Sequence, residues 1–238
     1  DGVRTLRGAL LAGVLMSLGL VAAVFLWFGA ALGAYTGVGA ATGVGVLLVL
    51  APLMQPQVLA FVLARQLAGR RHGPVLRALA GAAAWVGVEW ALPKLLGDTL
   101  AHGLFPTALL RQAADLGGAA GLTFALVLVN EAVAAALARR RAGTRALLAP
   151  LGGAAAIVVA LAGYGAARLS TLQAPSAAAP TLRVAMVQAS ITDYERLRQE
   201  IGAYGVVRKV LDTHYALSQS AVRDHDADVL LWSETVYP

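Results

Sequence analysis

The carboxylate best placed to do chemistry is Glu234, which follows the last apolar run of the chain. Residues 229–232 read Val-Leu-Leu-Trp, and Ser233 separates them from the glutamate. Such a run predicts a buried strand, and residues at the carboxyl ends of strands often form the active sites of α/β sheets. Partial desolvation at that place raises the pKa of a carboxylate, which suits a general base. Strand ends also carry polar residues with no catalytic role, so position alone leaves both interpretations open.

Other reactive side chains are scarce in this sequence. The 238 residues contain no cysteine, which excludes a disulfide, a thiolate metal site and a cysteine nucleophile within them. The histidines lack the spacing of a metal site, so we expect interface or surface positions for His72, His102, His214 and His225. We therefore predict no metal and no cofactor.

The elements that must position Glu234 form a short alternating pattern. The sequence predicts a strand at 182–187, a helix at about 194–223 and a second strand at 229–232. Gly202 and Gly205 weaken the first half of that helix. Strand, helix and strand in this order are the beginning of an α/β domain with a parallel sheet.

The remainder of the chain is unusually apolar. Hydrophobic residues make up 58% of the whole sequence and charged residues only 13%, which is unlike a soluble domain. Several apolar runs are long enough to cross a hydrocarbon core about 30 Å thick, although the third is short. The predicted spans are residues 9–33, 43–64, 75–92, 113–137 and 146–168. The fold class expected is thus an α-helical transmembrane bundle of about five spans followed by the start of an α/β domain.

Nearly all the positive charges of residues 1–180 lie outside the predicted spans, in short segments that flank them. Residues 1–180 carry 13 Lys and Arg against 5 Asp and Glu, whereas residues 181–238 carry 6 against 8. The arginines gather before the first span, between the second and third, and between the fourth and fifth, which the positive-inside rule places in the cytoplasm. The region after the fifth span is then predicted to be extracytoplasmic. A basic patch for nucleic acid requires arginines on one solvated face, so we exclude that partner.

Two pairs of polar residues inside the predicted spans need an explanation. Asn130 and Glu131 lie near the inner end of the fourth span, where we expect them to reach the interface beside the Arg139 cluster. Gln55 and Gln57 accompany two prolines and predict a kink with a structural role.

The segment 93–112, which connects the third and fourth predicted spans, has an unusual composition for a loop. It is too broken by proline and glycine to span the membrane and too apolar for a plain solvated loop, which favours an outer-face loop in the interface or a re-entrant one. Trp90 is expected at headgroup level. A lipid tail could pass at this loop from the bilayer to the C-terminal domain.

Two sets of residues carry a resemblance to a known family. Residues 183–191 (RVAMVQASI) and 228–238 (DVLLWSETVYP) resemble the opening of a nitrilase-type carbon–nitrogen hydrolase domain, in which a glutamate ends the second strand. Such a domain outside a multi-span bundle resembles the bacterial apolipoprotein N-acyltransferase family. Residues 88–90 (VEW), 102–107 (HGLFPT) and 111–124 (RQAADLGGAAGLTF) are similar to membrane stretches of that family.

This resemblance implies a two-step acyl transfer in the bacterial inner membrane. A cysteine thiolate takes an acyl chain from a phospholipid, and the terminal amine of an apolipoprotein then accepts it. Glu234 would be the base, and a downstream lysine would stabilise the oxyanion. Gly103, Phe105 and Pro106 of the loop are the candidate lipid-binding residues.

The resemblance also predicts a domain organisation and leaves alternatives open. We expect a transmembrane domain at 1–169, a linker at 170–180 and the first part of a nitrilase-like extracytoplasmic domain at 181–238. The absence of the family's cysteine predicts a fragment that also lacks spans before residue 1, and Thr107 and Ser233 depart from the family's residues. The alternatives are a membrane-tethered nitrilase-superfamily amidase or acyltransferase with another substrate, and a non-catalytic membrane scaffold.

Overall fold

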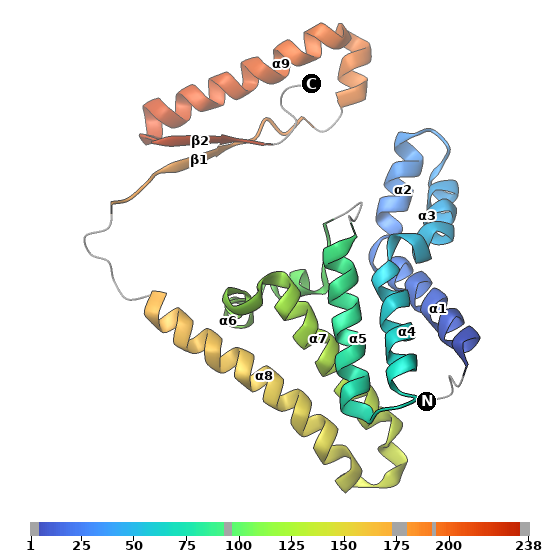
Figure 1. Cartoon of the computed structure of the whole chain (residues 1–238). Helices are drawn as coiled ribbons and strands as arrows, with labels where there is room; N and C mark the ends of the chain where they lie inside the picture. The colour runs from blue at the N-terminus through green and yellow to red at the C-terminus, as the bar shows by residue number, and fades with distance from the viewer. Residues whose placement is uncertain (1–4, 93–96, 173–179, 192–193, 234–238) are drawn as a thin grey trace. The chain divides into compact units, whose positions relative to one another are not determined.

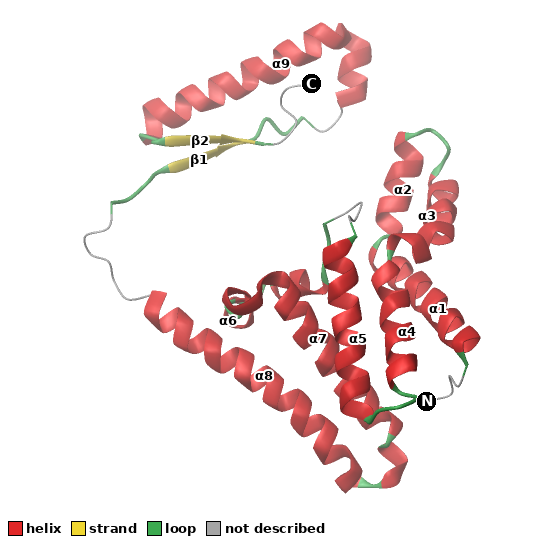
Figure 2. Cartoon of the chain, in the orientation of Figure 1, coloured by secondary structure: helices red, strands yellow, loops and turns green. Residues whose placement is uncertain are grey.

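The computed structural model describes residues 5–92, 97–172, 180–191 and 194–233. The chain divides into two units, Asp1–Ala174 and Pro175–Pro238, and each is described by itself. The first unit is helical throughout its described residues, and the second combines one long helix with a pair of strands (Figures 1 and 2).

Five helices of the helical unit, α1, α4, α5, α7 and α8, pack against one another in chain order. α1 contacts α4, α4 contacts α5, α5 contacts α7 and α7 contacts α8, while α2 and α3 form a hairpin at one end (Figure 1). The bounds are α1 (Leu6–Val24), α2 (Leu26–Tyr35), α3 (Ala40–Met54), α4 (Pro56–Ala68), α5 (Pro74–Ala91), η1 (Leu100–Leu104), α6 (Ala108–Arg111), α7 (Ala114–Ala138), η2 (Arg140–Ala142) and α8 (Thr144–Leu172). α8 thus continues into the first residues of the predicted linker.

Fewer helices than the five predicted spans meet the length and hydropathy of a membrane span within the described residues. Within the described residues, α1, α7 and α8 are long and apolar enough to cross a membrane, and the bent pair of α3 and α4 makes a fourth if it acts as one span. α5 forms where the third span was predicted, but Arg77 and Glu89 lie within it and lower its hydropathy. A membrane protein with several crossings is nevertheless what this composition supports.

The predicted first span is interrupted at Phe25, where α1 ends and α2 begins. α2 instead packs on α3 at very short range. A Cβ added at Gly43 would lie 2.2 Å from the Gly29 carbonyl oxygen, and one at Gly33 would lie 2.3 Å from that of Gly39. Only glycine permits this approach of two helix backbones. The connecting turn contains Gly37 at φ 75°, as the turn residues at this place predict.

The predicted kink lies between α3 and α4, which are bent by 44°. Pro56 is the first residue of α4, so it has no amide hydrogen to offer. Gln55 and Gln57 are both buried here, and the Gln57 side-chain amide donates to the Gln55 side-chain oxygen. This one hydrogen bond joins two buried amide side chains at the kink, which supports the structural role expected of them.

The interior of the helical unit lies where α1, α4, α5 and α7 meet. Its largest cluster of buried residues includes Val58, Phe61, Trp85 and Val127. The rings of Phe61 and Trp85 meet edge to face with centroids 5.9 Å apart, an arrangement that aromatic pairs favour. This cluster holds α5 in the unit.

The C-terminal unit has the predicted strand–helix–strand order. β1 (Val184–Val187) and β2 (Val229–Trp232) pair in parallel, with α9 (Tyr194–His225) between them in sequence. α9 is interrupted at Gly202, whose φ of 76° is in the left-handed region. The strand predictions and the parallel pairing are confirmed.

Candidate functional site

The loop between α5 and α7 is folded rather than extended, and a chain of hydrogen bonds holds its beginning. The Ala101 amide donates to the Thr123 hydroxyl at 3.3 Å, and this hydroxyl bonds to that of Thr99. The Thr99 hydroxyl in turn donates to the Glu89 carboxylate at 3.2 Å. Thr123 is fully buried, so these bonds satisfy a polar side chain that would otherwise be costly inside the unit.

The middle of the loop presents an aromatic side chain. Phe105 is 71% exposed, and the Arg111 guanidinium lies 5.1 Å from the centre of its ring. Arg111 also donates to the Phe105 carbonyl oxygen at 2.8 Å, so it holds both backbone and ring. Gly103 and Pro106 are exposed on either side. The candidate lipid-binding residues therefore lie together on the surface of the loop.

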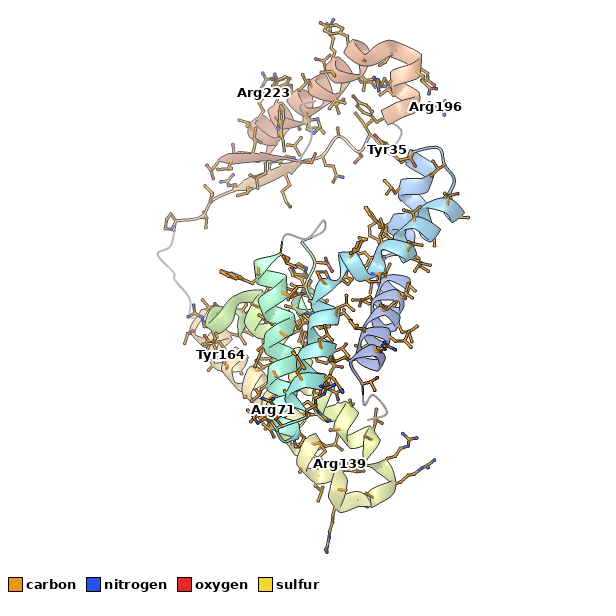
Figure 3. All side chains as sticks on the ribbon, turned by 45° about the vertical axis from the view of Figure 1, so that its right-hand side comes forward. Tyr35, Arg71, Arg139, Tyr164, Arg196 and Arg223 are labelled. Atoms are coloured by element: carbon orange, nitrogen blue, oxygen red, sulfur yellow. The ribbon has the colours of Figure 1, made fainter. Side chains whose placement is uncertain are left out.

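The end of the loop is fastened to α8. A Cβ at Gly165 would lie 1.8 Å from the Leu109 carbonyl oxygen, so α6 rests directly on the backbone of α8. Asp115 accepts a hydrogen bond from Arg168 at 2.6 Å and one from Tyr164 at 3.4 Å. Figure 3 shows Tyr164 well along α8 from Arg139, which lies at the α7–α8 connection. The loop thus folds over the α8 end that is remote from the arginine cluster.

A pocket of about 580 Å³ opens between the loop and the end of α5. It combines apolar walls with two carboxyl groups, those of Glu89 and Asp98. Its lining consists of Val86, Glu89, Trp90, Ala91, Leu92, Gly97, Asp98, Thr99, Ala119 and Ala120. Trp90 has most of its surface exposed, as a side chain at headgroup level would. The exposed loop residues Gly103, Phe105 and Pro106 do not line this pocket.

The carboxyl edge of the strand pair is the second candidate site. Val187 pairs with Trp232, so Gln188 and Ser233 are the first residues beyond the sheet on neighbouring strands. Both are exposed. Glu234 itself lies outside the described residues, and its role stays a prediction.

Trp232 is held firmly at this edge by residues of α9. Its indole N–H donates to the Ser218 hydroxyl at 2.9 Å, and its ring centroid lies 5.1 Å from that of His214 and 5.3 Å from that of Tyr215. His214 is only 3% exposed, and its Nδ1 lies 2.8 Å from the Val210 carbonyl oxygen. The prediction of an interface or surface position is therefore wrong for His214, which packs in the core of this unit.

Among the described residues, no group of three or more His, Cys, Asp or Glu side chains is arranged to hold a metal ion.

The prediction that Glu131 reaches the interface beside the Arg139 cluster is wrong, because its carboxylate is buried and pairs with a different arginine. Glu131 is 9% exposed and forms an ion pair with Arg65 of α4, with Nε and Oε2 2.8 Å apart. It stays inside the unit because that partner satisfies its charge. Asn130 is exposed and donates to the Leu126 carbonyl of its own helix. No local signal in the sequence links Glu131 to a residue 66 positions away.

The comparisons with known proteins concern the helical unit. The family model of the apolipoprotein N-acyltransferase N-terminal domain matches residues 2–132, more than half of the chain. This range begins well before residue 75, where the resemblance seen in the sequence starts, and ends before the strands. No curated protein and no solved structure gives a significant match. The chain belongs to the apolipoprotein N-acyltransferase family.

Proposed function

We propose that this protein serves the transfer of an acyl chain from a phospholipid to the terminal amine of an apolipoprotein, through a cysteine thioester. The observation that carries the proposal is the family match over residues 2–132. The membrane helices and the exposed aromatic loop support a lipid donor. The cysteine must come from outside these 238 residues, which contain none.

In the first step the thiolate sulfur attacks the ester carbonyl carbon of the phospholipid. A C–S bond forms, the ester C–O bond breaks, and the lyso-phospholipid leaves as an alcohol. In the second step the amine nitrogen attacks the thioester carbonyl, a C–N bond forms, and the thiol is released. Because the thiolate is the nucleophile, a neighbouring base is needed.

Glu234 is the proposed base, which takes the thiol proton and passes it to the leaving alkoxide. Two features of the described residues support a general base directly after β2. β2 ends at Trp232, two positions earlier, and the Ser218 hydrogen bond with the His214 and Tyr215 ring contacts fixes that end. A general base works only when its support is rigid.

We also propose that residues 181–238 begin a nitrilase-like domain, joined to the helical unit by residues 170–180. One face of the strand pair supports this proposal, because it carries apolar side chains that are exposed. Val184, Met186, Val229 and Leu231 lie on that face, and Met186 is 85% exposed. An αββα domain would cover such an apolar face with further protein.

The loop is proposed as the place where the donor lipid approaches. Phe105, Gly103 and Pro106 would contact acyl chains, and the carboxyl groups of the neighbouring pocket would attract the ammonium group of phosphatidylethanolamine. This requires the loop and the C-terminal unit to be extracytoplasmic, in the inner membrane of a bacterium.

The test is formation of an acyl thioester by the protein expressed from its natural reading frame. The protein is incubated with acyl-labelled phosphatidylethanolamine, and hydroxylamine-sensitive label is measured. Glu234→Gln should reduce thioester formation by roughly 10²–10⁴-fold, the contribution typical of a general base. The matched control is Glu200→Gln, which removes an exposed carboxylate paired with Arg196 in α9 and should leave labelling unchanged.

The outcomes separate the candidates. No thioester in the unmodified protein overturns acyl transfer from a phospholipid and favours an amidase or a scaffold. Normal labelling in Glu234→Gln removes Glu234 from the mechanism while leaving the acyl transfer intact.

A further inference from the structure

A further pocket lies at the turn between α4 and α5, at the same end of the helical unit as the α7–α8 connection (Figure 1). It has a volume of about 770 Å³, and its lining combines two arginines and a histidine with apolar side chains. The lining includes Leu67, Arg70, Arg71, His72, Leu76 and Ala80. The pocket shares no residue with the one beside the α5–α7 loop, so it is separate from the place proposed for the donor lipid.

The backbone of the turn is ordered by hydrogen bonds to the end of α4. The amides of Arg70, Arg71 and His72 donate to carbonyl oxygens of the last two residues of α4, at distances of 2.9 to 3.3 Å. These bonds satisfy carbonyl groups that the end of a helix leaves without a partner. The three side chains are therefore presented together from one short turn.

Arg70 and Arg71 are exposed and bring two positive charges to the lining of the pocket. Within the part of the chain that the structure describes, neither guanidinium forms an ion pair. Glu131 of α7 pairs with Arg65 instead, with Nε and Oε2 2.8 Å apart. A phosphate group that binds both arginines would compensate their charges, because the guanidinium fork matches the geometry of phosphate oxygens.

The remainder of the lining suits hydrocarbon. Leu67 in the last turn of α4 and Leu76 in the first turn of α5 are each 53% exposed. Leu76 and Ala80 are four positions apart and so lie on one face of α5. The pocket thus combines a cationic part with an apolar part, as an anionic amphiphile requires. A free phosphate would make no use of the two leucines.

We propose that this pocket binds an anionic glycerophospholipid of the cytoplasmic leaflet, with its phosphate at Arg70 and Arg71 and an acyl chain against Leu67, Leu76 and Ala80. Basic pockets between membrane helices on the cytoplasmic side bind anionic headgroups in this way. The positive-inside rule assigns this turn to that side. The proposal does not depend on acyl transfer.

The experiment is native mass spectrometry of the detergent-solubilised protein, expressed from its natural reading frame and titrated with phosphatidylglycerol or phosphatidylethanolamine of the same acyl chains. We expect tighter binding of phosphatidylglycerol. Replacing both arginines, Arg70→Gln together with Arg71→Gln, should weaken that binding roughly 25-fold, because each basic contact contributes about fivefold.

The matched control is the double variant Arg140→Gln and Arg141→Gln. It also removes two consecutive exposed arginines from a connection at the same end of the unit, but neither residue lines the pocket. General attraction of anionic lipid to this end would fall equally in both double variants. Binding in the pocket predicts that the control keeps most of the affinity.

A second pair of variants tests the apolar part without touching any charge. Ala80→Phe should place a ring in the pocket and weaken phosphatidylglycerol binding roughly tenfold, which corresponds to about two methylene groups losing their burial. Ala83→Phe is the control, because Ala83 lies on the same helix, is exposed and does not line the pocket. Both substitutions change the helix propensity of α5 equally, and thermal unfolding in detergent verifies that both variants are folded.

Four results would overturn the proposal. Equal losses in the two arginine double variants would mean general attraction to the basic end. Equal affinity for the two lipids would remove the preference for an anionic headgroup. Equal losses in Ala80→Phe and Ala83→Phe would remove the acyl chain from the pocket. Competition by glycerol 3-phosphate as strong as that by phosphatidylglycerol would mean a site for free anions, since glycerol 3-phosphate has no acyl chain.

Discussion

The helical unit and the C-terminal unit distribute their apolar side chains in opposite ways. On α3 and α8, large apolar residues such as Val49, Leu53 and Val159 are mostly exposed. In the same unit, polar residues of α1 and α7 are buried, namely Ser17, Thr123 and Glu131. On α9 the exposed face carries ion pairs, among them Arg196 with Glu200 and Arg208 with Asp212. The first pattern suits a hydrocarbon surrounding and the second suits water.

This difference teaches how an exposed apolar residue is to be interpreted in each unit. On the helices that meet the length and hydropathy of membrane spans, such a residue suits a hydrocarbon surrounding. On the C-terminal unit the same exposure at Met186 marks a strand face suited to further protein. The next three predictions test this comparison.

The largest expected effect concerns the side of the membrane on which each end of α8 lies, because a residue is either reached by an external reagent or not. These 238 residues contain no cysteine, and the unsubstituted protein measures the background labelling from the cysteine proposed outside them. Because α8 is long and apolar enough to cross the membrane, Arg141→Cys and Arg223→Cys are expected to lie on opposite sides. In intact cells a membrane-impermeant maleimide should label only Arg223→Cys, and Arg141→Cys should react after permeabilisation. Labelling of both in intact cells would mean that α8 does not span, and the reverse pattern would invert the proposed orientation.

The second prediction compares one exposed residue from each unit. Val159 of α8 is 68% exposed and Tyr204 of α9 is 80% exposed. Val159→Arg should disfavour membrane insertion by about 2.5–3.5 kcal/mol, because it places a charge near the centre of a span. Tyr204→Arg should change stability by no more than about 0.5 kcal/mol. The fraction of chains resistant to alkaline extraction measures the first, and thermal unfolding measures the second. Equal effects would remove the distinction between the two units.

The third prediction concerns a buried polar contact of the helical unit. Glu131→Leu leaves Arg65 without its carboxylate and should lower stability by about 2 kcal/mol. The loss is smaller than that for a wholly buried pair because Arg65 is 30% exposed. The measurement is thermal unfolding in detergent. Asn130→Leu is the matched control, since its amide bonds only within α7; a loss as large as that of Glu131→Leu would mean that the ion pair is not the cause.

Much of the local structure could be predicted from patterns within a few residues. The two strands follow from short apolar runs, the turn near Gly37 from its glycines, and the break in α9 from Gly202. These features depend on side-chain alternation and on backbone angles that glycine alone adopts readily. The candidate site could be predicted less well from the sequence. Its hydrogen bond between Thr99 and Thr123 and its pocket beside Glu89 are formed by segments that are distant in the sequence.

The amino-acid sequence by itself determined that this is a multi-pass membrane protein with an α/β segment at its end. The mean hydropathy of a segment and the spacing of its apolar residues depend on that segment alone, so both can be evaluated without knowing which other elements it contacts. Only the tertiary structure decided that the chain turns at Phe25, that Glu131 pairs with Arg65, and that Leu67 and Leu76 line one pocket. Each depends on which helices become neighbours, and that choice is made by close packing at glycines and by burial of charge beside an opposite charge.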